Sequence, residues 1–238
     1  MKKYCLSVCF LLLLAGCQHS LYGGNAVIDW VDFIKWDDIS YDGIHSGVLS
    51  DETFIGEKIG TVQFKVSDNV TNPNYKTKNG DAAFHEKGTE IYSIKGAPHL
   101  LAVKSEHTIN GYDVYFAREE TEYKWHFKDM PMDRVKKAEI YQSPTVNNEQ
   151  YDLISNLNNA DEVSKFLNLL QNSEEKPDFQ PNMENGDPTY YEMIFYIDGE
   201  PIAYKYTLAF DGATYFWYPW DTSVISGEIG SFLDSPTN

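Results

Sequence analysis

Residues 190–217 read YYEMIFYIDGEPIAYKYTLAFDGATYFW, and this stretch decides the fold class. Over 202–208, large apolar or aromatic residues alternate with smaller or polar ones, which is the period of two typical of a half-buried strand. Asp-Gly pairs lie at 198–199 and 211–212, and Asp-Gly after such a strand is a strong signal for a hairpin turn. The stretch therefore predicts three strands, over 190–197, 202–208 and 213–217, connected as an antiparallel meander.

A helix is predicted immediately before this meander. Its apolar positions have the spacing i, i+3, i+4, i+7, which forms a stripe along one face. These positions are Val163, Phe166, Leu167 and Leu170. Asn159 or Asp161 can cap the first turn, where a side-chain oxygen accepts a backbone N–H. The polar run over 172–187 predicts a long loop after the helix, and the tail over 224–233 could form a short helix.

The first half of the chain has strand signals of its own. Residues 62–66 and 112–116 alternate between apolar and polar side chains. Asn110-Gly111, just before the second of these runs, is again a hairpin signal. A short apolar run at 90–94 is bounded by glycines. These signals predict a mainly antiparallel β domain over 27–125.

Together these elements predict an α+β fold in two parts. The first is the mainly β domain over 27–125, and the second is a small helix-plus-β-meander domain over 151–238. Residues 126–150 are expected to connect them, and 135–141 within this connection could be a strand. The chain has 238 residues, which suits one large domain or two small ones.

The charge of the chain limits its partners. It has 36 acidic and 19 basic residues and a formal net charge of −17. Such a surface repels nucleic acid and anionic lipid headgroups, so we expect no nucleic-acid partner. An alternative explanation of the same charge is that it keeps the protein dispersed in solution.

The N-terminus has the features of an export signal. Residues 1–17 read MKKYCLSVCFLLLLAGC, with two lysines before an apolar run over 8–14. A positive start, a short apolar core and small residues before the cut are typical of a secretory signal peptide. The alternatives are an uncleaved anchor or a buried helix. The run is too short to span the membrane, which takes roughly 20 apolar residues.

The last four residues of this signal, Leu14-Ala15-Gly16-Cys17, resemble the lipobox of bacterial lipoproteins. The resemblance implies removal of residues 1–16, a lipid on Cys17, and a tether over 17–26. It also implies a location on the extracytoplasmic face of the cell membrane. The three cysteines, Cys5, Cys9 and Cys17, all lie in this segment. No disulfide, thiol nucleophile or thiolate metal site is therefore expected in the mature domain.

Three further stretches, IGEKIGTV at 55–62, GDAAF followed by KGTEIYSIKG over 80–96, and LAV at 101–103, occur in a recognisable order. In this order they resemble an uncharacterised lipoprotein family of Bacillus-like Firmicutes. The resemblance implies a Gram-positive cell-surface lipoprotein and no particular catalytic residue. Backbone geometry offers another explanation of these residues, since Gly80, Gly88 and Gly96 fall at predicted strand ends, where a positive φ is often needed.

No catalytic, cofactor or metal motif is present in the sequence. The histidines are scattered, at His19, His45, His85, His99, His107 and His126. No pair has the i, i+4 spacing of a His-Glu-x-x-His zinc site, and neither a phosphate-binding glycine loop nor a Gly-x-Ser-x-Gly elbow occurs. We therefore predict no cofactor, metal or catalytic residue. Acidic clusters could still supply two carboxyl groups about 5–9 Å apart, as glycosidases require.

The most distinctive local feature is the aromatic stretch YFWYPWD at 215–221. Alternation along a strand sends Tyr215 and Trp217 to one face and Phe216 and Tyr218 to the other. If one face is exposed, its rings can bind a sugar, a peptide or a protein. The candidate binding residues are Tyr215, Trp217, Tyr218 and Trp220. The alternative is that the helix covers one face and the N-terminal domain covers the other.

These observations favour a lipid-anchored cell-surface protein without catalytic activity, which binds an envelope protein, peptide or glycan. The alternative is an envelope hydrolase whose site is not visible in the sequence. A binding lipoprotein that feeds a transporter is disfavoured, because such proteins are usually longer and have two lobes of alternating strands and helices. A pocket with converging histidines and carboxylates would favour the enzyme. An aromatic groove without titratable groups would favour the binding protein.

Overall fold

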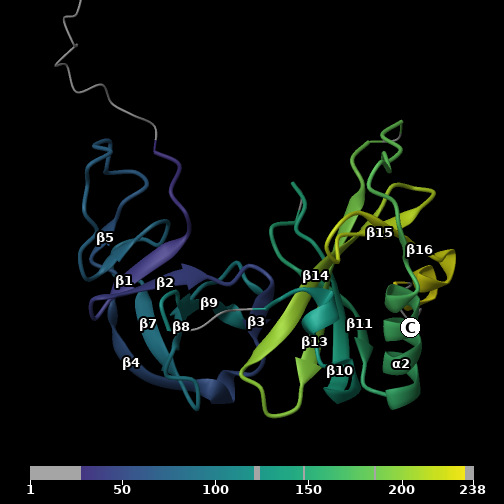
Figure 1. The fold of residues 1–238 in the computed structure, drawn as a ribbon, viewed down its shortest axis with the longest axis horizontal. Coiled ribbons are helices and arrows are strands. Elements are labelled where there is room, and N and C mark those ends of the chain that lie inside the picture. The colour runs from purple at the N-terminus through teal and green to yellow at the C-terminus, as the bar shows by residue number, and fades with distance from the viewer. Residues whose placement is uncertain (1–27, 121–123, 147, 185, 234–238) are drawn as a thin grey trace, which may run out of the picture.

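The computed structural model describes residues 28–120, 124–146, 148–184 and 186–233, and this part of the chain is mostly β (Figure 1). The strands form two curled sheets in which nearly all pairs are antiparallel. The predicted signal peptide over 1–16, the lipidated Cys17 and the tether to residue 26 lie outside the described residues, so they stay predictions. The helices in the described part are too short or too polar to span a membrane.

The first sheet is built from the N-terminal half of the chain. Its spatial order is β4-β7-β8-β9-β2-β1-β6-β5. The bounds are β1 (Phe33–Trp36), β2 (Ile39–Gly43), β4 (Ile55–Thr61), β5 (Phe64–Lys65), β6 (Asp81–Ala82), β7 (Glu90–Ile94), β8 (Leu100–Lys104) and β9 (Tyr112–Ala117). Asn110 and Gly111 have positive φ angles of 63° and 77° in the connection between β8 and β9. This confirms the predicted hairpin turn, and the antiparallel character holds except for the parallel pair β5–β6.

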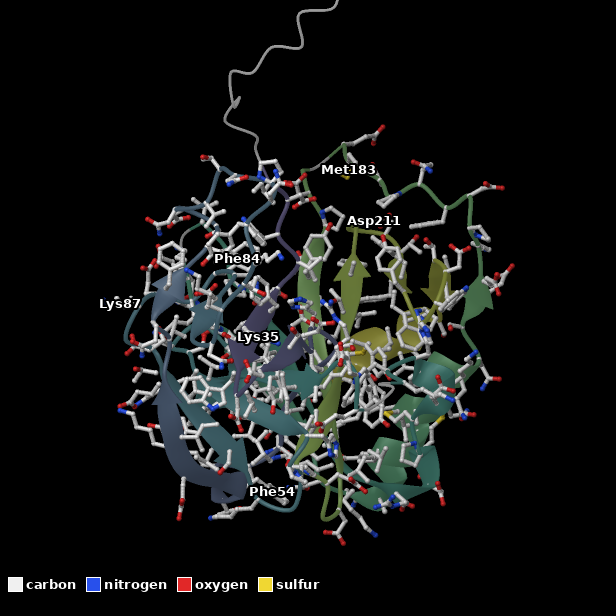
Figure 2. The ribbon with its side chains drawn as sticks, turned by 60° about the vertical axis from the view of Figure 1, so that its left-hand side comes forward. Lys35, Phe54, Phe84, Lys87, Met183 and Asp211 are labelled. Carbon is white, nitrogen blue, oxygen red and sulfur yellow. The ribbon has the colours of Figure 1, made fainter. Side chains whose placement is uncertain are left out.

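The second sheet contains the predicted meander. Its spatial order is β11-β10-β13-β14-β15-β16-β12. The bounds are β10 (Val135–Gln142), β11 (Asp152–Leu157), β12 (Glu174–Glu175), β13 (Thr189–Ile197), β14 (Ile202–Phe210), β15 (Tyr215–Trp217) and β16 (Ser223–Ile225). Asp211 in the turn after β14 accepts backbone N–H groups of Thr214 and Asn182 at 2.7 and 2.9 Å. These bonds hold the segment around Met183 beside the turn (Figure 2).

One α-helix, α2 (Ala160–Gln171), packs against the outer face of the second sheet, away from the first sheet (Figure 1). The Asn159 side chain accepts the N–H of Asp161 at 2.8 Å, which confirms the predicted cap. All four predicted apolar positions of the helix are buried. One expectation is wrong in detail, since the segment over 172–187 contains β12, which pairs with β16 (Ser223–Ile225). The short helix expected in the tail is present as a 3₁₀ helix (Gly227–Phe232).

A short strand joins the two sheets. β3 (Gly47–Leu49) follows β2 in the chain, yet it pairs with β14, and Figure 1 shows it between the two sheets. A side-chain carbon added to Gly47 would lie 2.8 Å from Ile202, so glycine allows this close pairing. A buried apolar cluster beside the joint includes Leu49 and Leu100 together with Ile202. The domain boundaries at 27–125, 126–150 and 151–238 stay predictions. β3 comes from the first of these ranges and β10 from the second, and both belong to the second sheet.

Candidate functional site

The pairing of β3 with β14, which joins the two sheets, leaves a gap along one side of β14. β13 covers the other side of this strand. On the open side, β3 pairs with residues 202–204 and β15 with residues 208–210. Lys205, Tyr206 and Thr207 lie between these two partners, where the N–H of Lys205 donates to the carbonyl of Ser46 at 2.9 Å. Pro219 follows β15 closely and has no N–H to extend the pairing.

A groove of about 560 Å³ lies at this gap, and we call it the junction groove. Its aromatic rings are Phe116, Trp125, Tyr206 and Tyr218. Its polar side chains are His45, Ser46, His126, Lys205 and Thr207. Its volume and its mixture of rings with a few polar groups are typical of a site for a small ligand, and such sites often lie where two parts of a protein meet.

The structure brings two of the four predicted aromatic residues to this groove. Tyr218 lines it and is 52% exposed. Trp220 is 76% exposed and lies edge-on against His126, with the ring centroids 4.3 Å apart. Because His126 lines the groove, Trp220 stands at its rim. Tyr215 lies outside the groove, stacked on Phe210 at 4.3 Å.

Trp217 is a core residue, so its prediction as a binding residue is wrong. It is completely buried, and its indole N–H donates to the Ser173 hydroxyl at 2.9 Å. Phe127 packs edge-on against its ring, with the ring centroids 4.7 Å apart. The neighbouring Phe216 is also buried, and Phe179, from the segment between β12 and β13, contacts it at 5.1 Å. Both faces of β15 are therefore covered at these two residues, and the exposed rings come only after the strand ends.

The charged side chains that line the junction groove are basic. Lys205 is half-buried, and its ammonium makes no ion pair or side-chain hydrogen bond with another described residue. His45 and His126 are the other titratable groups apart from tyrosines, and no Asp or Glu is among the described lining residues. Glu192 of β13 lies opposite Thr207, on the face of the sheet that also carries Lys205, and accepts the Thr207 hydroxyl at 3.1 Å. Burial raises the pKa of Glu192, although Lys205 and Thr207 act in the opposite direction.

A polar cluster in the first sheet reaches the groove through His45. The His45 Nε2 lies 3.7 Å from an oxygen of Asp32, and Tyr115 donates its hydroxyl to the other oxygen at 2.9 Å. The His85 Nε2 lies 2.7 Å from the same hydroxyl. Since the phenol donates its proton to Asp32, its oxygen is left to accept the Nε2–H of His85.

Burial dominates the protonation of this cluster. It raises the pKa of the Asp32 carboxyl, while the bond from Tyr115 and the nearby histidines oppose the rise. Burial raises the pKa of Tyr115 far above its ordinary value, so this phenol remains a neutral donor. Gly43 leaves the space for the carboxylate, since a carbon added there would lie 2.3 Å from Asp32. The sequence did not reveal this cluster, because its members come from separate strands and loops.

The remaining predicted features do not converge on the groove. His99 lines a second groove of about 510 Å³ on the other side of Trp125, and His107 lies in a separate depression. An ion pair at 2.9 Å between Arg134 and Glu200 crosses the wall of the second groove. Within the described residues, no three His, Cys, Asp or Glu side chains form a group that could hold a metal ion.

Comparison with known proteins adds no relative: no family model matches the chain, and neither a curated protein nor a solved structure is similar to it. A function is therefore inferred from the geometry of the groove and of the polar cluster.

Proposed function

We propose that this chain is a lipid-anchored protein on the extracytoplasmic face of the cell membrane, which binds a carbohydrate of the cell envelope in the junction groove. The lipobox at 14–17 supports the anchor. The proposal includes a Gram-positive surface lipoprotein family and the two-part α+β organisation, with boundaries at 27–125 and 151–238. The observation that carries the binding activity is the groove itself, where aromatic rings alternate with side chains that can form hydrogen bonds.

The shape of the groove favours a small ligand over a macromolecular surface. A stable protein interface buries about 800 Å² on each partner, around flat or protruding aromatic anchors. The groove is concave, and of its rings Tyr218 is the one with more than half of its surface free. A peptide that adds a strand needs an open edge, and the gap along β14 is only three residues long, 205–207.

The chemistry of the groove favours a sugar over a purely apolar molecule. A pyranose presents C–H groups on one face and hydroxyls around its edge, so it needs a ring to stack on and donors or acceptors at the side. Tyr218 and Trp125 supply rings, and Thr207, Ser46 and His126 supply polar groups. Phe116 of β9 adds a ring from the first sheet, so the bound sugar contacts both sheets.

Binding is tested with the chain from residue 26 onward, which keeps every contact described above. We expect chitooligosaccharides or other defined envelope oligosaccharides to bind in calorimetric titrations. Replacing a hot-spot ring costs on the order of 2 kcal/mol, so Tyr218→Ala should weaken binding roughly 30-fold. Phe84→Ala is the matched control, since Phe84, just after β6 (Figure 2), is 48% exposed and is not among the residues that line the groove. Equal affinities for Tyr218→Ala and the parent chain would contradict the proposal.

The anchor is tested separately in cells. Cys17→Ser removes the sulfur that would accept the lipid, so the protein should be released from the membrane or remain as an uncleaved precursor. Fractionation and mass measurement distinguish these outcomes. Normal processing with unchanged membrane retention would exclude a lipid on Cys17.

A second candidate function, hydrolysis of the bound sugar, is favoured by the polar cluster. Asp32 has a raised pKa and lies beside His45, which lines the groove. A carboxyl with a raised pKa is suited to general acid catalysis, and because Asp32 does not itself line the groove, it would act through His45. Reducing ends should then appear during incubation with the bound oligosaccharide, and Asp32→Asn should stop their release without loss of binding. If the parent chain released no reducing ends, hydrolysis would be ruled out and binding would remain as the proposed function.

A further inference from the structure

The half-buried Lys205 has a position that the neutral part of a sugar does not explain. Its backbone N–H is held by Ser46, so the residue is fixed at the floor of the gap. Its side chain lines the junction groove and also a small cavity of about 50 Å³ behind it. An ammonium that is partly removed from water is costly unless an anion compensates it. No described carboxylate forms an ion pair with it.

The acids near Lys205 form no ion pair with it. Glu192 lies opposite Thr207 on the same face of the sheet as Lys205 and interacts with Lys205 electrostatically, but its carboxylate bonds the Thr207 hydroxyl. Asp113 lines the small cavity, but its carboxylate lies 3.8 Å from His85. Asp32 is bonded by Tyr115. The groove thus presents one permanent positive charge, in a chain whose formal net charge is −17.

We infer that the junction groove recognises an acidic sugar of the hexuronic class, and that Lys205 binds its carboxylate. This inference rests on the proposed function and names the substrate class of the same site. The ring of the sugar lies against Tyr218, and the carboxylate at its edge reaches the ammonium of Lys205, with the Thr207 hydroxyl beside it.

The net charge of the whole chain further limits the classes of ligand that can bind. A long polyanion would meet repulsion from the acidic surface around the groove, whereas a ligand with one carboxylate meets the one lysine and little else. A phosphate-bearing polymer would need more basic groups than the single Lys or Arg among the described lining residues. A short chain that ends in one hexuronic acid fits both conditions.

The test uses two disaccharides that differ only at the carboxylate, one ending in glucuronic acid and one ending in glucose. We expect the acidic form to bind about tenfold more tightly at low salt, as is typical for a hydrogen bond to a charged group. The difference should shrink as the ionic strength rises, because Lys205 is only half-buried. A phosphorylated disaccharide of the same size should not match the glucuronate. If it binds more tightly, the carboxylate assignment is wrong.

Substitutions separate this inference from the proposed function. Lys205→Gln should abolish the preference, so that the two forms bind with equal affinity, while Lys205→Arg should keep the preference. Tyr218→Ala should weaken both forms equally. Lys87→Gln, at an exposed position in the turn before β7, is the matched charge control (Figure 2). A preference that survives Lys205→Gln would overturn the role of Lys205 alone. If neither disaccharide binds the parent chain, the proposed sugar-binding function fails as well.

Discussion

The two sheets bury different chemistry. The second sheet packs under α2 around fully buried rings, including Phe166, Phe195 and Trp217. The first sheet has no α-helix against it within the described residues, and beside its apolar core it holds Asp32 and Tyr115. The core under α2 therefore depends on close packing, and the buried carboxylate of the second sheet, Glu139, is bonded by Tyr141 and Tyr196. The first sheet keeps the Asp32–Tyr115 pair next to the junction. This difference places the Asp32–Tyr115 cluster on the first-sheet side of the groove and the aromatic core on the second-sheet side.

The largest expected effect tests the aromatic core. Trp217→Ala removes a fully buried ring and its bond to Ser173, and cavities of this size cost about 3–5 kcal/mol of the free energy of unfolding. Urea denaturation at neutral pH measures this loss. A loss under about 1 kcal/mol would mean that the second sheet does not depend on close packing as we describe.

A smaller loss is expected from the polar cluster of the first sheet. Tyr115→Phe keeps the ring but removes the hydroxyl between Asp32 and His85, so a buried acceptor loses its donor. Such a loss costs about 1–3 kcal/mol. Tyr218→Phe is the matched control, because that residue is largely exposed and should change stability by less than about 0.5 kcal/mol. Equal effects of the two variants would show that the cluster contributes nothing to folding.

The pH dependence of stability should have opposite signs in the two sheets. In the first sheet, burial raises the pKa of Asp32. Its contribution to stability is full below the unfolded pKa, near 3.9, and is lost as the pH rises through the folded pKa. Asp32→Asn avoids this loss, so the variant should gain in free energy of unfolding relative to the parent as the pH rises from about 3 to 7.

In the second sheet, Glu139 behaves in the opposite way. Burial opposes its ionisation, but bonds from Lys137, Tyr196 and Tyr141 outweigh burial and lower the pKa of Glu139. Its stabilising contribution is present above the unfolded pKa and is lost as the pH falls through the folded pKa. Glu139→Gln should therefore be less stable than the parent at pH 7, and the difference should fade in acid. Parallel urea titrations of Glu139→Gln and Asp32→Asn check both signs. If the free energies of unfolding of both variants, relative to the parent, changed with pH in the same direction, the distinction between the sheets would be wrong.

Much of the secondary structure could be predicted because its signals are local. The cap at Asn159, the apolar stripe of α2 and the Asp-Gly turn at 211–212 each lie within a few residues. β3 could not be predicted in the second sheet, since only three residues, Gly47–Leu49, pair with partners more than 150 positions away. No periodicity within so short a strand indicates which sheet it joins.

The candidate site was predictable only where its residues are neighbours in the sequence. The aromatic stretch pointed to Tyr218 and Trp220, which do lie at the groove. Strand alternation wrongly included Trp217, because it cannot show that Phe179 and the core cover both faces of β15. The basic residue Lys205 had no signal of its own. Its place in the groove depends on the gap between β3 and β15, which only the folded sheet reveals.

The smallest expected effect on stability belongs to the groove ring next to Trp217. Tyr218 follows directly in the sequence, but it is 52% exposed, whereas Trp217 is completely buried. Tyr218→Ala should therefore change the free energy of unfolding by less than about 0.5 kcal/mol, while it weakens sugar binding. Urea melts and titrations of the same preparations measure the two effects together. If Tyr218→Ala costs several kcal/mol of folding, its ring is part of the core, and the groove loses the platform on which the proposed function depends.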